Sequence, residues 1–237
     1  KLFEKYIYSK YFKITCVSHG AKKNLIKWLG KSYDNKKTIV LSNGARFFKL
    51  TNRKNFKNIK IRLISVGSLR KAKGFDIAIK AISLIKNHVE SYTILGEGNE
   101  KNNLISLASN LGIKDKIILP GYKNNLDAYY KNANLGLSPS RWEGFGLSVI
   151  EMLSSGLPLV CSNISGVNEI VNNCSAVKLV KSENSHLLAK GILNLFRKIK
   201  KDGYKNISLK ARIRAEKYSL KTMLKNYEQL YLNTFRK

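Results

Sequence analysis

The chain has 237 residues, of which 43% are hydrophobic, 10% aromatic and 25% charged; this globular composition excludes a disordered tail, a collagen-like repeat and a disulfide-dense mini-protein. The 44 Lys and Arg outnumber the 15 Asp and Glu, which gives a net charge of +29. No apolar run approaches the roughly 18 residues that a membrane-spanning helix needs. The scattered Cys16, Cys161 and Cys174 indicate reduced thiols rather than disulfides or zinc ligands. Because the sequence begins with Lys1 and not Met, we expect a fragment.

Short β-branched runs alternate with longer segments of helical period along the chain, as in a parallel α/β protein. The expected strands are residues 14–17, 38–41, 61–66, 92–95, 116–119, 134–138, 157–160 and 177–180. The expected helices are residues 75–87, 99–111, 126–131, 146–155, 167–172, 187–200 and 205–217, with two more that begin at Ser18 and Ser219. Asn43 and Gly44 are expected to form a turn, followed by a polar, basic linker. The pattern predicts a doubly wound parallel sheet of the α/β class, which binds ligands at the carboxyl ends of its strands.

The positive charge lies mainly on the two flanks of the chain. Residues 1–60 carry 16 basic and 2 acidic side chains (+14), residues 61–177 carry 12 and 9 (+3), and residues 178–237 carry 16 and 4 (+12). Three interpretations are open: the compositional bias of a Lys- and Asn-rich chain, attraction to an anionic membrane surface, and nucleic-acid binding. The last is the weakest, because no zinc-finger spacing or RNP-like segment is present.

The segment 139–151 is the most informative for chemistry. Glu143 follows an expected strand, and residues 144–147, rich in glycine, lead into a helix. A glycine loop at a helix N-terminus presents unpaired backbone N–H groups and partial positive charge, which suits a phosphate. Glu151 comes eight residues after Glu143, on a similar side of the helix and about 12 Å along it. The two carboxylates suit the two ends of an elongated nucleotide ligand; the alternative is that both are surface residues.

A second basic segment follows the expected strand 61–66. Gly67 ends this strand, Arg70 and Lys73 come next, and Gly74 opens a helix. A guanidinium and an ammonium group placed in this way can neutralise a diphosphate. Because lysine is abundant throughout the chain and this segment is not a Walker A loop, the segment on its own is weak evidence for a phosphate site.

Taken together, these segments resemble the family 4 (group 1) glycosyltransferases of the GT-B fold, in the same order along nearly the whole chain. The matching features are Val17-Ser18, Asn43-Gly44, Gly67 with Lys73-Gly74, Gly96-Glu97-Gly98, Gly121-Tyr122, the Glu-x7-Glu signature of Glu143 and Glu151, Gly156-Leu157-Pro158, Gly166 with Glu169, and Tyr218-Ser219. The resemblance implies the Rossmann-like, donor-binding C-terminal half of such an enzyme. Residues 1–42 would be a remnant of the N-terminal acceptor domain, 43–60 the interdomain linker, 61–217 the nucleotide-sugar donor-binding domain, and 218–237 a helix that crosses back to the N-terminal domain.

The resemblance also implies roles for individual residues. Glu143, at the donor sugar, and Lys73, at the diphosphate, would be the catalytic residues. The donor-binding residues would be Gly67, Ser68, Arg70, Gly121, Tyr122, Gly144, Phe145, Gly146, Leu147 and Glu151. Of these, Glu151 would hold the ribose hydroxyls, Gly121 and Tyr122 would meet the base, and the amides of residues 145–147 would join Lys73 at the diphosphate.

The implied reaction is the retaining transfer of a hexosyl or N-acetylhexosaminyl group from a nucleotide-diphosphate-sugar, with UDP preferred over GDP as the nucleotide. The implied acceptor is a glycan or lipid-linked glycan in the synthesis of a bacterial surface polysaccharide, either lipopolysaccharide or capsule. No metal and no other cofactor is expected, and nucleic acid is not an expected partner. The expected location is the cytoplasm, including the inner face of the plasma membrane, where the basic flanks would dock on anionic lipid.

Some positions depart from the family's pattern. The arginine usual after the strand-end glycine is Ser68 here, so either Arg70 takes over its phosphate contact or Lys73 acts without it. Arg46 replaces an acidic residue and is expected to affect only the linker. His19 lies in a different motif from the family's histidine near the reacting centre and is expected to have a helix-start or surface role. His88 and His186 are expected to be solvent-facing helix residues.

Two other classes of function are open. A sugar-nucleotide epimerase of the same fold would need catalytic carboxylates and a histidine, which we do not identify in the sequence. A non-enzymatic basic binder of membranes or nucleic acid would show an affinity that falls steeply with salt. Because most of the acceptor domain is missing, we expect no turnover by these 237 residues alone.

Overall fold

The computed structural model describes residues 2–11, 13–30, 33–50 and 59–235. The strands are β1 (Ile14–Cys16), β2 (Thr38–Val40), β3 (Ile61–Val66), β4 (Val89–Leu95), β5 (Ile117–Gly121), β6 (Leu135–Ser138), β7 (Leu159–Ser162) and β8 (Val177–Val180). The helices are α1 (Leu2–Lys10), α2 (His19–Leu29), α3 (Phe75–Leu84), α4 (Lys101–Asn110), α5 (Asp127–Asn132), α6 (Leu147–Ser154), α7 (Ser165–Val171), α8 (Ser185–Asp202), α9 (Tyr204–Glu216) and α10 (Leu220–Phe235).

The main sheet has the strand order β5-β4-β3-β6-β7-β8, and all neighbouring strands are parallel. The chain runs outward from β3 to β5, returns to β6 beside β3, and then runs outward in the other direction to β8. The order therefore reverses between β3 and β6. A crevice forms at the carboxyl ends of the strands at such a switch point, and it is where open α/β sheets bind their ligands.

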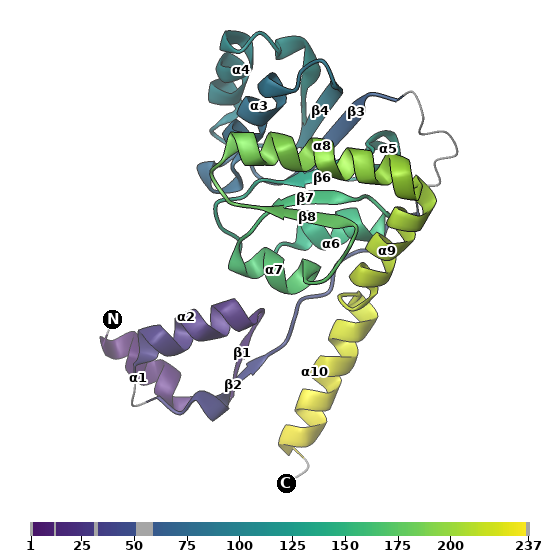
Figure 1. Ribbon diagram of the computed structural model, residues 1–237. Helices are drawn as coiled ribbons and strands as arrows, with labels where there is room; N and C mark the ends of the chain where they lie inside the picture. Colours follow the sequence, from purple (N-terminus) through teal and green to yellow (C-terminus); the bar gives the residue numbers. More distant parts are fainter. Residues whose placement is uncertain (1, 12, 31–32, 51–58, 236–237) are drawn as a thin grey trace.

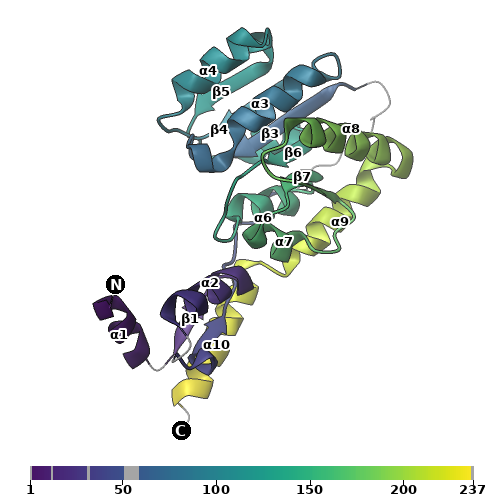
Figure 2. The same cartoon turned by 60° about the vertical axis from the view of Figure 1, so that its left-hand side comes forward.

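Helices cover both faces of the main sheet. Helices α3, α4 and α8 pack together on one face, and α6, α7 and α9 pack on the other (Figures 1 and 2). Strands β6 and β7 are buried along their whole length, as expected for central strands of a parallel sheet with two covered faces. The hydrophobic core is contiguous and runs through the sheet and both helix layers.

The N-terminal segment, residues 2–42, lies apart from the main sheet as a second layer that contains α1, α2 and the small parallel sheet of β1 and β2 (Figure 2). Helix α10 extends from the end of α9 alongside this segment (Figures 1 and 2). The Ala45 N–H donates to the carbonyl oxygen of Tyr218 at 3.0 Å, and Ala45 pairs with Ser219 in an isolated parallel bridge. The connector and the start of α10 thus run side by side.

Every strand and helix expected from the sequence is present, and α1 is an additional helix. Strand β7 starts two residues later than expected, at Leu159, since Pro158 has no N–H to donate to a ladder. Helix α3 ends at Leu84, because Ile85 leaves the helical conformation (φ −125°, ψ 24°) before the chain enters β4. His88 is therefore exposed as expected but lies outside a helix.

The prediction of a turn at Asn43 and Gly44 is wrong. No turn is assigned there, and the chain instead leads into the pairing of Ala45 with Ser219. Part of the linker expected over residues 43–60 (residues 51–58) falls outside the described residues. Of the helices that the structure describes, none is long and apolar enough to cross a membrane.

Candidate functional site

Lys73 and Glu143 meet at the switch point of the main sheet. Lys73 ends a 3-10 turn (Lys71–Lys73) after β3, and Glu143 lies in the loop after β6. The Lys73 Nζ is 2.7 Å from the Glu143 Oε1, and the Ser140 hydroxyl donates to the same oxygen at 2.9 Å. The two side chains are 23% and 11% exposed, respectively. The structure thus brings the two expected catalytic residues into one shielded ion pair.

Glycine at position 74 makes this approach possible. Gly74 has a left-handed backbone conformation (φ +65°), and a Cβ there would lie 2.1 Å from the carbonyl oxygen of Pro139. Any other side chain would push the loop after β3 away from the loop after β6, because a carbonyl oxygen in the backbone cannot give way. Gly74 therefore sets the distance between Lys73 and Glu143.

Arg141 connects the same two loops. Its guanidinium binds both carboxylate oxygens of Asp76 at 2.9 Å, the Lys71 carbonyl at 2.6 Å and Glu183 at 3.0 Å. Its backbone N–H donates to the Ala72 carbonyl at 2.8 Å. Burial raises the pKa of Asp76, but the hydrogen bonds and charge of Arg141 outweigh burial and hold this pKa below its usual value. The sequence analysis missed this connection, because nothing local in the sequence pairs Arg141 with a carboxylate 65 residues away.

The loop after β3 holds the remaining residues expected near the diphosphate. A Cβ on Gly67 would lie 3.3 Å from the Cε of Lys73, so Gly67 leaves room for the lysine stem. Ser68 is partly buried and accepts the Arg70 N–H on its carbonyl at 2.8 Å. Arg70 is exposed, and the described residues provide its guanidinium with no hydrogen bond or ion pair. The structure therefore brings Lys73, and not Arg70, to Glu143.

The loop before α6 has the form of an anion site. Gly146 caps the helix with φ +98°, and α6 begins at Leu147, so the first amides of the helix have no partner within it. Phe145 is buried and packs edge-on against Tyr218, with ring centroids 5.8 Å apart. Gly144 and Leu147 are exposed beside it. The partial positive charge of this helix end lies next to Glu143 and Lys73, where a diphosphate would be stabilised.

A cavity of about 270 Å³ lies on the β5 side of the switch point. We call it the nucleoside cavity, after the part of the donor that the family resemblance implies for Glu151 and Tyr122; its lining residues are Arg46, Phe48, Val66, Leu95, Gly96, Tyr122, Lys123, Asn124, Leu126 and Glu151. It follows the carboxyl ends of β3, β4 and β5. Tyr122 is 68% exposed at its edge, and the neighbouring Gly121 ends β5 with φ +80°. Glu151 and Tyr122, expected at the ribose and the base, thus line the same cavity.

Burial and one cation decide the charge of Glu151. Burial raises the pKa of Glu151, and the charge of Arg46 partly offsets this rise. Arg46 also lies over the Phe48 ring, at 5.1 Å from its centroid. The expectation that Arg46 affects only the linker is therefore wrong, because its side chain enters the nucleoside cavity beside Glu151. Only the folding of the connector over α6 brings the two together.

The N-terminal segment contacts the loops of the main sheet through the first turn of α2. The Ser18 hydroxyl donates to the Gly144 carbonyl at 3.1 Å. The Glu169 carboxylate accepts the N–H groups of His19 and Gly20, each at 2.7 Å. His19 thus begins a helix, as expected, and contributes its backbone to the contact. Exposed His186 lies on α8, as expected.

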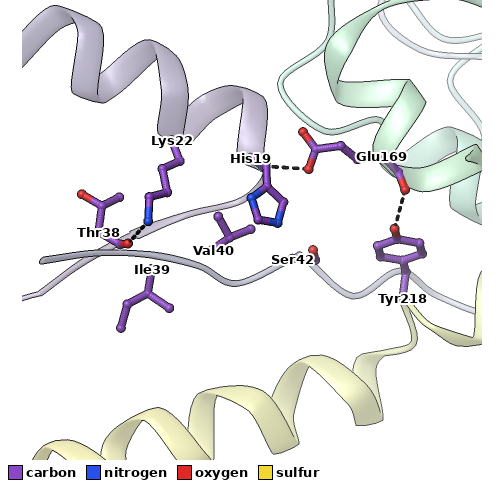
Figure 3. A pocket seen from close by; sticks show the side chains of 8 residues that line it. All are labelled: His19, Lys22, Thr38, Ile39, Val40, Ser42, Glu169 and Tyr218. Atoms are coloured by element: carbon purple, nitrogen blue, oxygen red, sulfur yellow. Dashed lines mark hydrogen bonds between the residues drawn. The ribbon is translucent and has the colours of Figure 1, made fainter. Parts of the chain in front are cut away.

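Two further cavities lie on either side of this contact. The interlayer cavity, of about 490 Å³, is lined by Ser18, Gly20, Ala21, Asn24, Arg141, Trp142, Glu143, Gly144, Ile164 and Ser165. The other cavity, of about 640 Å³, is lined by His19, Lys22, Thr38, Ile39, Val40, Ser42, Glu169 and Tyr218 (Figure 3). Figure 3 shows the Tyr218 hydroxyl donating to the Glu169 carbonyl, at 2.8 Å. Of the residues expected at the site, only Glu143 and Gly144 line either cavity, and both belong to the interlayer cavity.

Within the described ranges, no group of three or more His, Cys, Asp or Glu side chains is arranged to hold a metal ion. Cys16, Cys161 and Cys174 are all free thiols, and burial raises the pKa of Cys161 and Cys174.

Comparisons with known proteins agree with this geometry. The family model described as "Glycosyl transferases group 1" matches residues 47–228. An uncharacterized glycosyltransferase of Haemophilus influenzae is 30% identical over 169 residues, which cover 70% of this chain and 47% of the relative. The O-antigen biosynthesis glycosyltransferase WclY of Escherichia coli is 29% identical over 175 residues, covering 73% of this chain and 46% of the relative. The chain thus spans about half the length of these relatives.

The fold also matches a solved structure. The Anabaena protein HepE in complex with UDP and glucose superposes with a TM-score of 0.81 at 17% sequence identity. The match covers 97% of this chain and 66% of HepE. The doubly wound parallel sheet expected from the sequence is thereby confirmed.

Proposed function

Because the chain belongs to the group 1 glycosyl transferases, we propose that it binds a nucleotide-diphosphate-sugar for sugar transfer to a glycan or lipid-linked glycan in bacterial surface-polysaccharide synthesis. The name of the E. coli relative, an O-antigen biosynthesis enzyme, supports this type of acceptor. The observation that carries the proposal is the 2.7 Å pair of Lys73 and Glu143. It lies at the switch point, with the nucleoside cavity on one side and the interlayer cavity on the other.

In this proposal the donor lies along the carboxyl edge of the main sheet. The nucleoside occupies the cavity lined by Tyr122 and Glu151, where the carboxylate accepts hydrogen bonds from the ribose hydroxyls. The diphosphate lies between Lys73 and the first amides of α6, which together supply a point charge and a helix N-terminus. The donor sugar then reaches Glu143. On binding, the diphosphate competes with Glu143 for the Lys73 ammonium group.

The proposed reaction breaks the bond between the anomeric carbon of the sugar and the diphosphate oxygen. A hydroxyl oxygen of the acceptor forms the new bond to that carbon, and its proton passes to the leaving diphosphate. Lys73 and the α6 N-terminus stabilise the negative charge that develops on the diphosphate. Glu143 orients the donor sugar. Retention of the anomeric configuration is what the family resemblance implies.

The lining of the nucleoside cavity supports UDP as the donor nucleotide. Arg46 and Lys123 carry hydrogen-bond donors and no acceptor, which suits a base rich in carbonyl oxygens such as uracil. The UDP bound to the Anabaena neighbour supports the same choice.

The test is thermal unfolding of the chain with UDP, GDP and ADP in turn. A ligand at about 100 times its Kd adds about 2.7 kcal/mol to the free energy of unfolding, which raises the Tm of a domain of this size by several degrees. We expect the largest shift with UDP and its loss in Glu151→Ala. Glu90→Ala is the matched control, because this exposed carboxylate is at the amino end of β4, the opposite edge of the sheet. No shift with any nucleotide would overturn the proposal.

A further inference from the structure

The guanidinium group of Arg141 has nearly all of its hydrogen bonds within the chain itself. Its Nη1 and Nη2 donate to the two carboxylate oxygens of Asp76, at 2.9 Å each. Nη1 also donates to the Lys71 carbonyl at 2.6 Å, and Nε donates to Glu183 at 3.0 Å. These bonds use four of the five N–H groups that an arginine carries. A diphosphate held at the neighbouring Lys73 would therefore find at most one N–H group of Arg141 unused.

The bonds of Arg141 reach the chain on both sides of Lys73. The Lys71 carbonyl lies before Lys73 in the same 3-10 turn, and Asp76 lies after it in the first turn of α3. Arg141 itself precedes Glu143 in the loop after β6. One side chain thus holds the backbone before and after Lys73, and it does so from the loop that carries Glu143.

The ion pair of Lys73 and Glu143 cannot hold the two loops together once a donor is bound. In the proposed function the diphosphate competes with Glu143 for the Lys73 ammonium group, which weakens the 2.7 Å contact at that moment. The bonds from Arg141 to Asp76 and to the Lys71 carbonyl involve neither of these side chains, so they persist. Because a lysine ammonium is a point charge on a flexible stem, its contact with a phosphate depends on where the loop backbone places it.

We propose that Arg141 is a positioning residue for the donor diphosphate: its bidentate pair with Asp76 fixes the loop after β3 against the loop after β6, so that Lys73 points at the diphosphate while Arg141 leaves the donor untouched. This inference rests on the proposed function, since it takes the diphosphate to lie at Lys73. It has an unusual consequence for Asp76, a carboxylate that would by its charge repel a diphosphate. Removing that negative charge should weaken the binding of an anion.

The first test compares the binding of UDP and of uridine to the parent chain and to Asp76→Asn. The rise in Tm is measured over a range of ligand concentrations against the unliganded Tm of each chain, which gives a Kd for each ligand. Asp76→Asn removes the charge that pairs with Arg141 and should weaken UDP binding about tenfold, as expected for the loss of a charged hydrogen bond. Uridine, which has no diphosphate, should bind both chains equally. The matched control is Asp115→Asn, the same change at an exposed carboxylate just before β5, and it should alter neither Kd.

Replacements of Arg141 separate positioning from a direct phosphate contact. Arg141→Lys keeps the positive charge but lacks the planar fork that binds Asp76, so it should weaken UDP binding about tenfold, as much as Arg141→Gln. In a Lys73→Ala chain, which should bind UDP more weakly, Arg141→Gln should add no further loss, because no ammonium group is left to position. The side chains of Arg141 and Asp76 are 29% and 34% exposed, and the far-UV circular dichroism of these variants should match that of the parent chain.

The possible results distinguish the roles of Arg141. If Arg141→Gln weakens UDP binding while Asp76→Asn leaves it unchanged or strengthens it, Arg141 binds the diphosphate directly and the inference is overturned. Equal losses for UDP and uridine would also overturn it, because they would show general damage to the site. If UDP raises the Tm of the parent chain and of all variants alike, the inference is wrong and the proposed function stands. If no nucleotide shifts the Tm of the parent chain, the proposed function is wrong and the inference falls with it.

Discussion

The main sheet and the N-terminal segment are held in place by different interactions. The main sheet has a contiguous core that includes residues with no exposure at all, such as Ile64 and Leu135. In the described part of residues 2–42, the buried residues are Cys16, Ser18, Leu29, Thr38 and Leu41, and aromatic rings such as Phe3 and Tyr6 are exposed. The main sheet is thus stabilised by its own apolar burial, whereas the segment relies on contacts with its neighbours.

In the described residues, the segment is joined to the main sheet by hydrogen bonds and by Val17, which packs against the core. The carboxylate of Glu169 and the hydroxyl of Ser18 join the first turn of α2 to the loops of the main sheet. A carboxylate that accepts backbone N–H groups at a helix start also interacts favourably with the helix dipole. The interlayer cavity therefore depends on the contacts between these two parts of the chain, while the nucleoside cavity is built on the main sheet and its connector.

The largest expected effect tests whether the two regions differ in their cores. Ile64→Ala removes a fully buried side chain from β3, which pairs with both β4 and β6, and should cost about 2–5 kcal/mol in the free energy of unfolding. Leu29→Ala, on α2 and outside the contiguous core, should cost less than Ile64→Ala, because the cost of such a truncation depends on how tightly the surroundings are packed. Urea unfolding followed by far-UV circular dichroism measures both. Equal losses would contradict the comparison.

A smaller effect is expected from the contact between the two regions. Glu169→Gln removes the negative charge that accepts the His19 and Gly20 N–H groups, and should weaken the docking of α2 by about 1.5–3 kcal/mol. Hydrogen exchange of the α2 amides should become faster by about tenfold or more, while exchange in β3 and β6 should not change. Glu183→Gln serves as the control, since its exposed carboxylate contacts Arg141 and not α2. Unchanged exchange in α2 would show that other contacts hold the segment.

The smallest effect concerns the pH dependence of the nucleoside cavity. Burial raises the pKa of Glu151 in the folded chain above the unfolded carboxyl value of about 4.3. At a pH between these two pKa values, the folded state therefore binds more protons than the unfolded state. The contribution of Glu151 to stability is thus fully present below the unfolded pKa and is lost as the pH rises through the folded pKa. Glu151→Gln, which cannot ionise, should gain stability relative to the parent chain as the pH rises from acid to neutral. Denaturant midpoints at several pH values measure this difference, and a difference that does not change with pH would refute it.

Local rules predicted every strand and helix of both regions except α1. Residues 177–180 were expected as a strand and form β8 with the same bounds. Ser18 was expected at a helix start, and its hydroxyl accepts the N–H of Ala21, the third residue of α2. These features depend on periodicity and on capping, which are properties of a few consecutive residues. The alternation of strands and helices predicted the class of fold, and with it a ligand site at the carboxyl ends of the strands.

Long-range contacts explain what the sequence analysis could not find. Arg46 was expected to affect only the linker, yet it enters the cavity of Glu151, which lies 105 positions further along the chain. Arg141 is one arginine among nine in the sequence, and its contacts with Asp76 and Glu183 exist only because two loops meet at the switch point. The pairing of Ala45 with Ser219 has the same origin. Such contacts depend on the packing of the whole domain and leave no pattern in neighbouring residues.

The hydroxyl of Ser18 has a further consequence for how the two layers respond to ligands. It accepts the Ala21 N–H at 3.0 Å and donates to the Gly144 carbonyl at 3.1 Å, so that a single oxygen atom closes the first turn of α2 and holds the loop before α6. If the proposed donor immobilises this loop, the same hydroxyl links that ordering to α2, and by reciprocity a contact that fixes α2 would tighten donor binding by the same factor.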